Sequence, residues 1–205
     1  PEMAATCYLL FRFLCRLELF GFIDRNAAEC ILAGMMTDTG NFSYNCADPE
    51  MYVVTAELIR KGADKEKLYR RLFATFSENC LRLNSYALLD KMKVFSEYGA
   101  SLITLSRDEL NRFHYVKGDT EGLVNRPLAI PEVTYSCFMR EESDCVRVSM
   151  RSKGDFPVNL VCADNFGGGG HLNAAGGEFY GSLEDAAALF ESILEENKKR
   201  YITKE

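Results

Sequence analysis

The 205-residue sequence has no apolar run long enough to cross a membrane. Its longest uncharged apolar stretch near the N-terminus, residues 3–11, is followed by Arg12 and Arg16, whereas a spanning helix needs about 18–20 consecutive apolar residues. The first residues, Pro1-Glu-Met-Ala-Ala-Thr-Cys7, also lack the basic segment and apolar block of a secretory signal. We therefore expect a cytoplasmic protein with no membrane partner.

The sequence also lacks an excess of basic residues. It contains 24 Lys and Arg against 30 Asp and Glu, which gives a formal net charge of −6 at pH 7. Neutralised phosphates supply most of the affinity for long nucleic acids, so this balance argues against binding to long DNA or to an anionic membrane surface. Short anionic ligands, bound locally, are compatible with it.

A disulfide framework is absent from the pattern of the eight cysteines. No Cys-x-x-Cys pair occurs, and several cysteines lie within apolar runs such as Glu29-Cys30-Ile-Leu32. This usage is typical of reduced, mostly buried thiols in a cytoplasmic protein.

The first ninety residues are expected to be nearly all helical. Apolar residues recur at three- and four-residue spacing over residues 3–18, and further helices are predicted over 26–36, 65–73 and 78–95. Asp48-Pro49-Glu50 has the residues of a helix start, and Gly62 is a suitable stop.

The pattern changes after Gly99. Residues 100–105 read as a strand, and 135–139 with 146–150 read as a hairpin around a charged turn. Helices are predicted over 106–113, 119–126 and 157–165, and a last one begins at Ser182. The predicted class is therefore α/β, with a mostly helical first part, a junction near 85–98, and an α+β second part.

Glycine is concentrated in one segment. Six of the 15 glycines lie within residues 167–177, in the string Gly167-Gly-Gly-Gly-His171-Leu-Asn-Ala-Ala-Gly-Gly177. Four consecutive glycines carry a high entropic cost, which is tolerable where the backbone must approach a ligand closely or adopt positive φ. Consecutive N–H groups beside a helix start would bind an anion, and His171 adds a donor. A flexible loop is the alternative.

A basic strand end precedes the glycine string. Arg151-Ser-Lys153 follows the predicted hairpin, and the planar fork of an arginine suits phosphate, to which a lysine adds a point charge. Alone, such a strand end is more often a solvated edge. Beside an anion-binding segment, it favours phosphate binding.

An aspartate ends an apolar run in Gly34-Met-Met-Thr-Asp38-Thr-Gly40. A carboxylate held at the end of a rigid element is typical of a metal ligand. It is equally typical of a cap or a turn, and the string alone does not decide between them.

Taken together, these strings resemble a family. Their order along the chain, with Thr120-Glu-Gly-Leu-Val-Asn125 and Val148-Ser-Met-Arg-Ser152 between the first and the last, is similar to that of the Asp-His-His (DHH) phosphoesterases. The likeness is strongest to the bacterial oligoribonuclease/phosphoadenosine-phosphate phosphatase type, often called nanoRNase. It spans practically the whole chain, and the glycine-histidine string is its most specific part.

The resemblance implies an organisation. Residues 1–85 would be the remainder of a Rossmann-like DHH catalytic domain, residues 86–98 a connecting helix, and residues 99–205 a DHH-associated substrate-binding domain. The family's early aspartate motifs and its His-His pair have no counterpart, since the only histidines are His114 and His171. The chain therefore resembles the C-terminal two-thirds of such a protein, beginning inside the first domain.

The resemblance also implies roles for individual residues. Asp38 would be a metal ligand at the catalytic centre, Arg151 a phosphate contact, and His171 a catalytic donor to phosphate. The substrate-binding set would be completed by Gly168, Gly169, Gly170 and Asn173. His114 is expected to be a surface or packing residue.

The function implied is metal-dependent hydrolysis of short RNA or a nucleoside 3′,5′-bisphosphate by an exonuclease and phosphatase. Two divalent ions, usually Mn²⁺, would serve the complete protein, while this chain would hold none stably and be inactive alone. The sequence leaves open whether the protein forms a homodimer. Other superfamily members cleave longer single strands, cyclic dinucleotides or pyrophosphate, and the compact length favours small substrates. The alternative is a non-catalytic nucleotide sensor that uses the glycine-histidine loop.

Overall fold

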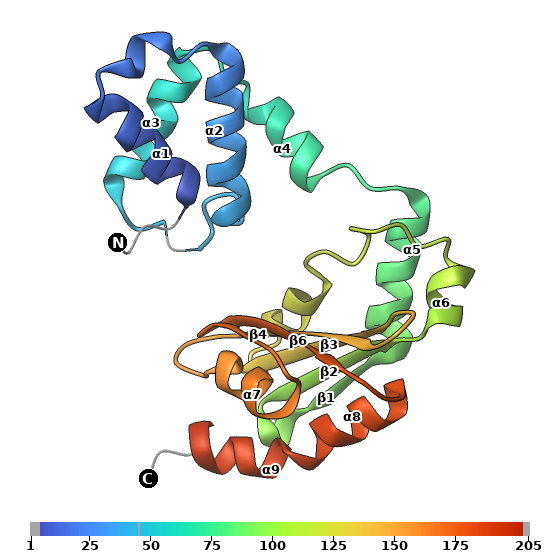
Figure 1. Cartoon of the computed structure of the whole chain (residues 1–205). Helices are drawn as coiled ribbons and strands as arrows, with labels where there is room; N and C mark the ends of the chain where they lie inside the picture. Colours follow the sequence, from blue (N-terminus) through green and yellow to red (C-terminus); the bar gives the residue numbers. More distant parts are fainter. Residues whose placement is uncertain (1–4, 45, 203–205) are drawn as a thin grey trace. The chain divides into compact units, whose positions relative to one another are not determined.

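The computed structural model describes residues 5–44 and 46–202, and the chain divides into two compact units, Pro1–Thr75 and Phe76–Glu205 (Figure 1). The class is α/β, as predicted. Among the described residues, no helix is both long and apolar enough to span a bilayer.

The described part of the first unit is helical. Aspartates begin three of its helices: Asp24, Asp48 and Asp64 each accept a hydrogen bond from a backbone N–H of the first turn. The predicted start at Asp48-Pro49 is confirmed, and Gly62 follows that helix with φ +99°. The elements are α1 (Thr6–Arg16), η1 (Leu19–Phe22), α2 (Arg25–Asp38), α3 (Pro49–Arg60) and α4 (Lys65–Phe73).

The core of the first unit lies between α1, α2 and α3. Its fully buried side chains include Leu32, Met35 and Leu58. A Cβ at Gly34 would lie 2.2 Å from Cys7 Sγ, so this glycine lets α1 pack directly on α2.

The second unit is built on a six-stranded sheet of order β1-β2-β3-β4-β6-β5. Only β2 and β3 are parallel, and α6 and η4 lie in the connection between them. Its helices are α5 (Glu78–Tyr86), η2 (Ala87–Lys91), η3 (Ser96–Tyr98), α6 (Arg107–Arg112), η4 (Leu123–Ala129), α7 (Val158–Asn165), α8 (Leu183–Ser192), α9 (Leu194–Asn197) and η5 (Lys198–Ile202). Its strands are β1 (Met92–Phe95), β2 (Ala100–Leu105), β3 (Tyr135–Glu141), β4 (Val146–Ser152), β5 (Gly169–His171) and β6 (Ala174–Phe179).

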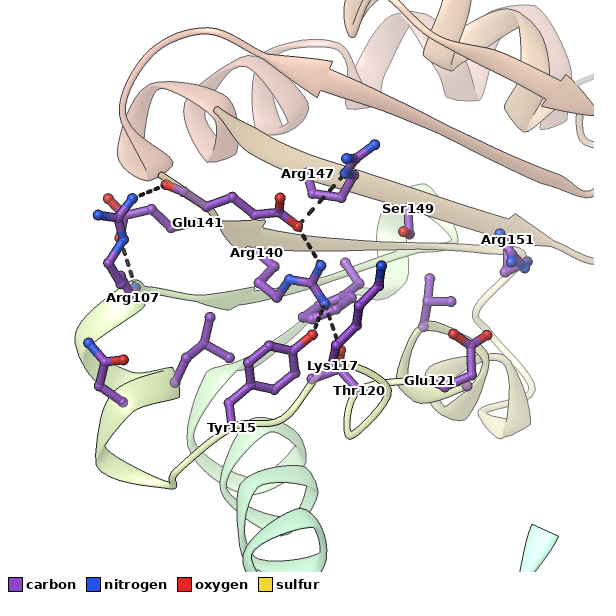
Figure 2. A pocket seen from close by; sticks show the side chains of 16 residues that line it. Arg107, Tyr115, Lys117, Thr120, Glu121, Arg140, Glu141, Arg147, Ser149 and Arg151 are labelled. Atoms are coloured by element: carbon purple, nitrogen blue, oxygen red, sulfur yellow. Dashed lines mark hydrogen bonds and ion pairs between the residues drawn. The ribbon is translucent and has the colours of Figure 1, made fainter. Parts of the chain in front are cut away.

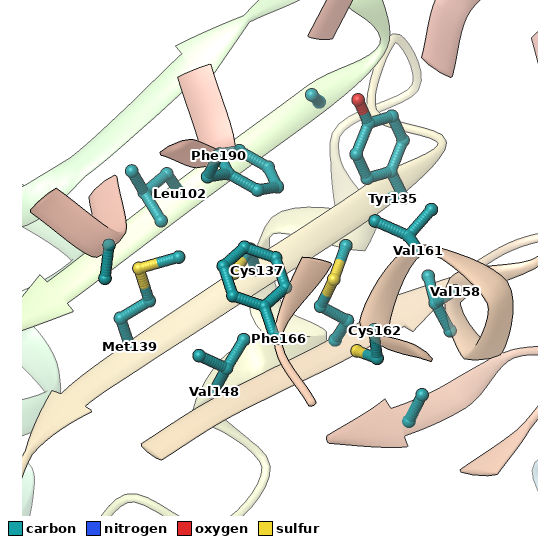
Figure 3. Close-up of a cluster of buried hydrophobic side chains, with 14 of the residues drawn as sticks. Leu102, Tyr135, Cys137, Met139, Val148, Val158, Val161, Cys162, Phe166 and Phe190 are labelled. Carbon is teal, nitrogen blue, oxygen red and sulfur yellow. The ribbon is translucent and has the colours of Figure 1, made fainter. Parts of the chain in front are cut away.

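The two faces of this sheet differ. One face packs against α7 and α8 in a large apolar core, where the rings of Tyr135 and Phe156 stack with centroids 4.0 Å apart (Figure 3 shows this core). The other face is covered by α5, α6 and η4 only over part of its width, where Leu83 packs with Ile103 and Phe138. On the rest of that face, β4 carries the polar side chains of Arg147, Ser149 and Arg151.

The cysteines are free thiols, as expected for reduced residues. The prediction that most are buried is wrong, because only Cys80, Cys137 and Cys162 are buried and Cys30 is exposed. Burial raises the pKa of the Cys162 thiol to about 12.

Three expectations differ from the structure around the sheet. The helix predicted over 78–95 ends at Tyr86, continues as one π-helical turn, and gives way to β1, because Met92–Phe95 pairs with β2. The division falls between Thr75 and Phe76, and the segment 86–98 lies inside the second unit. The helix predicted over 119–126 is a 3₁₀ helix, Leu123–Ala129, preceded by Gly122 at φ +76°. The hairpin and the helix after Ser182 are confirmed.

Candidate functional site

The open face of the sheet holds a pocket in the second unit. Along β4, Val146, Val148 and Met150 enter the core, so the alternate residues Arg147, Ser149 and Arg151 point to the opposite face (Figure 2). They border a cavity of about 580 Å³. Its other lining residues come from α6, the segment 115–124, and β3: Arg107, Leu110, Asn111, Tyr115, Lys117, Thr120, Glu121, Gly122, Val124, Phe138, Arg140, Glu141 and Glu142.

Cations outnumber carboxylates in this lining, although the chain as a whole is acidic. Arg140 is engaged inside the protein: it pairs with Glu142 at 2.5 Å and donates to Tyr115 Oη and Thr120 Oγ1 at 2.7 and 3.1 Å. These bonds hold the segment 115–120 against β3. The charge of Arg140 is thus largely satisfied without a ligand.

Arg151 is in a different situation. Its Nη1 donates only to backbone carbonyls, those of Met150 at 2.9 Å and Ala175 at 3.5 Å. Across the described ranges, neither Arg151 nor Lys117 forms an ion pair with a carboxylate. The guanidinium of Arg151 therefore keeps its charge available for an anion at the pocket.

Glu142 is the main internal anion at the other end of the pocket. The hydrogen bond from Arg140 lowers the pKa of its carboxyl, and the charges of Arg140, Arg147 and Lys117 lower it further, against a smaller effect of burial. Arg147 lies 3.8 Å from Glu142 and 2.9 Å from Glu178. At this end of the pocket, Arg140 and Arg147 thus surround the Glu142 carboxylate, and Arg147 also pairs with Glu178.

The glycine-histidine string forms strands, not the loop beside a helix start that its composition suggested. Residues Gly169–His171 are the edge strand β5 and pair with β6. The register places Ala174 opposite Arg151 on β4 and opposite His171 on β5. Directly paired residues point to the same face of a sheet, so Arg151 and His171 share the open face, with backbones about 10 Å apart across two strand spacings.

The glycines of the string have distinct physical roles. A Cβ at Gly168 would lie 1.9 Å from the carbonyl oxygen of Gly176, so close backbone packing within the fold requires this glycine. Gly170 has φ +148°, and its Cβ would meet Ala174. At Gly169, by contrast, a Cβ would meet nothing within 4 Å. Within residues 167–177, Gly169 is therefore the one glycine that neither close packing nor a positive φ explains.

Two polar side chains near the string form hydrogen bonds to other parts of the second unit. The Asn173 amide donates to Ser152 Oγ at 2.9 Å and to the Gly154 carbonyl at 2.7 Å, which ties β6 to the turn after β4. The Lys153 ammonium donates to the carbonyls of Leu128 and Ile130 at 3.1 and 3.2 Å. Lys153 therefore caps the end of η4, and a role of its charge beside Arg151 stays a prediction.

Asp38 lies in the first unit, at the end of α2, where Oδ2 accepts a hydrogen bond from the Thr6 N–H at 3.2 Å. In the described part of the chain, no group of three His, Cys, Asp or Glu side chains is placed to hold a metal ion. One carboxylate does not hold two divalent ions, so the described residues do not fit such a centre by themselves.

The pocket includes residues that the motifs did not indicate, chiefly Tyr115, Lys117, Arg140 and Arg147. The sequence could have predicted Arg147, because alternation along β4 places it on the same face as Arg151. His114 is exposed, outside the pocket, with φ +50° after α6, as expected for a surface residue.

Comparison with known proteins identifies the family of the chain. A family model described as the DHHA1 domain matches residues 101–196, which contain the pocket and both Arg151 and His171. The structure matches the crystal structure of an exopolyphosphatase-related protein from Bacteroides fragilis with a TM-score of 0.93 and 49% identity, over 97% of this chain and 58% of that chain.

Curated relatives match at lower identity. The chain is 31% identical over 158 residues to the Bacillus subtilis protein named bifunctional oligoribonuclease and PAP phosphatase NrnA, covering 77% of this chain and 49% of that protein. It is 32% identical over 168 residues to the Thermus thermophilus protein of the same name, covering 82% and 49%. The chain belongs to the DHH phosphoesterase family, which confirms the resemblance. It spans about half the length of the curated relatives it matches.

Proposed function

We propose that the second unit binds one phosphate of a nucleotide or short oligonucleotide between Arg151 and His171. The observation that carries this proposal is their register: both lie opposite Ala174, on the same open face. A methyl group is the only side chain between them. Charge-assisted hydrogen bonds from a guanidinium and an imidazole are well suited to a phosphate in that space.

Two further features support the proposal. Arg151 has no carboxylate partner among the described residues, so binding a phosphate breaks no ion pair of this arginine. Gly169, on the exposed edge strand, leaves open space where a side chain would otherwise stand. A ligand can therefore approach the β5 backbone closely, in keeping with the role in substrate binding that we propose for Gly168, Gly169 and Gly170.

For the whole protein, the proposed activity is hydrolysis of short oligoribonucleotides or of a nucleoside 3′,5′-bisphosphate, by two divalent ions with Mn²⁺ as the expected metal. The names of the relatives support the substrate class. Asp38 is the one metal ligand that we propose in this chain. Asn173 is a weaker candidate for a nucleotide contact, through the carbonyl oxygen that its amide leaves free. The free thiols support a cytoplasmic location.

A nucleotide sensor without catalysis is the second candidate. The described residues favour it in one respect, because they contain binding groups and no complete metal site. Retention of two Mn²⁺ ions by a longer version of the chain, extended upstream of Pro1, would exclude the sensor. Nucleotide binding by that longer chain with no retention of Mn²⁺ would support it.

Titration of the chain with adenosine 3′,5′-bisphosphate, by NMR or calorimetry, tests the phosphate site. A hydrogen bond to a charged group contributes about 1.5–3 kcal/mol, so Arg151→Ala and His171→Ala should each weaken binding about tenfold or more. His114→Ala is the matched control, since His114 is an exposed histidine after α6 and is not on the strands that carry Arg151 and His171, and it should leave binding unchanged. Wild-type affinity in both Arg151→Ala and His171→Ala would contradict the proposal.

A further inference from the structure

The polar side chains of β4 are regularly spaced along the open face. Arg147, Ser149 and Arg151 occupy alternate positions, and Figure 2 shows them in a row at the edge of the pocket. Alternate residues of a strand lie about 6.7 Å apart, so Arg147 and Arg151 are separated by about 13 Å. The three side chains are thus evenly spaced, and the distance from the first to the last is longer than a single phosphate group.

This spacing matches the repeat of a nucleic-acid backbone. Six covalent bonds separate neighbouring phosphorus atoms in RNA, the same number that two peptide units span, so the phosphorus atoms lie at most about 7 Å apart. A single strand laid along β4 would therefore place one phosphate beside each of the three residues in turn.

We propose that β4 is a phosphate ladder in which a ligand held at Arg151 extends along the strand, with its next phosphate at Ser149 and its third at Arg147. The inference rests on the proposed function and adds to it a residue that distinguishes ligands by their number of phosphates. Arg147 is a specificity-determining residue in this scheme: it is reached by a ligand with three consecutive phosphates and not by a nucleoside bisphosphate.

The surroundings of Arg147 support an anion at this end. Lys117 and Arg140 line the same part of the pocket, and both act on the Glu142 carboxylate, which stands among the three cations. Arg140 Nη2 lies 2.5 Å from Glu142 Oε1, and Arg147 Nη1 lies 2.9 Å from Glu178 Oε1. In this scheme a third phosphate would replace the glutamates as the anion beside Arg147.

The present partners of Arg147 can be displaced. The side chain of Arg147 is 48% exposed, and those of Glu142 and Glu178 are 35% and 36% exposed. Exposed ion pairs are weak because water screens both charges, so exchanging a carboxylate for a phosphate costs little. Glu142 and Glu178 then act as internal competitors that weaken binding of the third phosphate without affecting the first.

The test compares two ligands on the 205-residue chain: adenosine 3′,5′-bisphosphate, with two phosphates, and 5′-phosphorylated triadenylate, with three. We expect wild type to bind the triadenylate at least tenfold more tightly. Arg147→Gln should reduce this preference at least fivefold while changing the affinity for the bisphosphate less than twofold. The slope of log K against log salt for the triadenylate should also fall by about 0.7, the value for one phosphate contact on a single strand.

Two further variants sharpen the result. Glu142→Gln should tighten triadenylate binding about threefold and leave the bisphosphate unchanged, because it removes a competing charge. Arg82→Gln is the matched control, since Arg82 pairs with Glu78 at 2.8 Å on α5 outside the pocket, and it should alter neither ligand.

The outcomes separate the ladder from the phosphate site. If Arg151→Ala weakens the bisphosphate but Arg147→Gln leaves the preference for triadenylate intact, the ladder is wrong and the proposed function stands. In that case the ion pairs of Arg147 with Glu142 and Glu178 serve only to stabilise the β3–β4 hairpin and its pairing with β6. If Arg151→Ala does not weaken the bisphosphate, the proposed function fails and the ladder fails with it.

Discussion

Arg151 on β4 and His171 on β5 both lie opposite Ala174, which separates them by a single methyl group on the open face of the sheet. The two residues are 20 positions apart in sequence, and only the pairing of β6 with both neighbours brings them together. The small side chain between them determines how much room a ligand has.

The first prediction concerns that room. Ala174→Val should weaken binding of adenosine 3′,5′-bisphosphate about tenfold, because two added methyl groups occupy the space between Arg151 and His171. The melting temperature should stay within about 2 °C of wild type, since Ala174 is half-buried and valine is favoured in strands. Calorimetry and thermal unfolding check the two parts. Unchanged affinity in a folded variant would place the phosphate elsewhere.

The second prediction separates two neighbouring glycines. Gly168→Ala should lower the free energy of unfolding by about 1–3 kcal/mol or more, because its Cβ would collide with the backbone of β6. Gly169→Ala should leave stability nearly unchanged, since the methyl group meets no protein atom within 4 Å. It should weaken nucleotide binding, because the methyl group takes the space through which the ligand approaches the β5 backbone. Urea unfolding and a nucleotide titration of both variants are the measurements. Equal stability losses would show that Gly169 is also required by the fold.

The third prediction concerns Glu109, whose side chain is 18% exposed. Burial raises the pKa of its carboxyl, but hydrogen bonds from Lys91, Tyr86 and the Ser106 N–H lower it more, so the net pKa lies below the ordinary 4.5. A lowered pKa in the folded state means that this stabilisation is complete above about pH 5 and is lost as the pH falls through the folded-state pKa.

Glu109→Gln should therefore lower the free energy of unfolding by about 1–3 kcal/mol at pH 7, and the difference from wild type should shrink at pH 3. Urea unfolding at the two pH values is the measurement. The control is Glu195→Gln, which breaks an exposed pair with Lys199 on the last helices and should change little. A difference that persists unchanged at pH 3 would contradict the assignment.

The fourth prediction concerns the smallest part of the second unit that folds. Residues 76–205 alone should give a dispersed amide NMR spectrum. Residues 99–205, which the sequence pattern indicated as a domain, should not, because they lack β1 and the α5 side chain of Leu83 that covers Ile103 and Phe138. Comparable dispersion of the two spectra would show that α5 and β1 are dispensable.

The fifth prediction concerns catalysis by the chain as given. The 205-residue protein should not hydrolyse a dinucleotide in the presence of Mn²⁺, because the described residues do not assemble a metal centre around Asp38. A turnover assay with and without Mn²⁺ is the measurement. Mn²⁺-dependent cleavage that Asp38→Asn abolishes would show that the metal centre is complete in this chain.

Local features were predictable because they depend on neighbouring residues. Asp48 and Pro49 begin α3 through a side-chain cap and a proline in the first turn. The hairpin of β3 and β4 follows from alternation around a charged turn. The segment Met92–Phe95 was predicted as helix because nothing in its own residues reveals that it pairs with β2.

The sequence by itself determined the family, through the cluster of glycines before His171 and the arginine at the end of β4, and it named these residues as the candidates for phosphate binding. It also determined the helix caps, since a cap involves residues two or three positions apart. Only the tertiary structure decided that the glycines form an edge strand, that Lys153 and Asn173 are occupied within the fold, and that Arg147 stands among Glu142 and Glu178. The physical reason is that strand register and ion pairing depend on residues distant in sequence, whose positions are set by packing of the whole sheet.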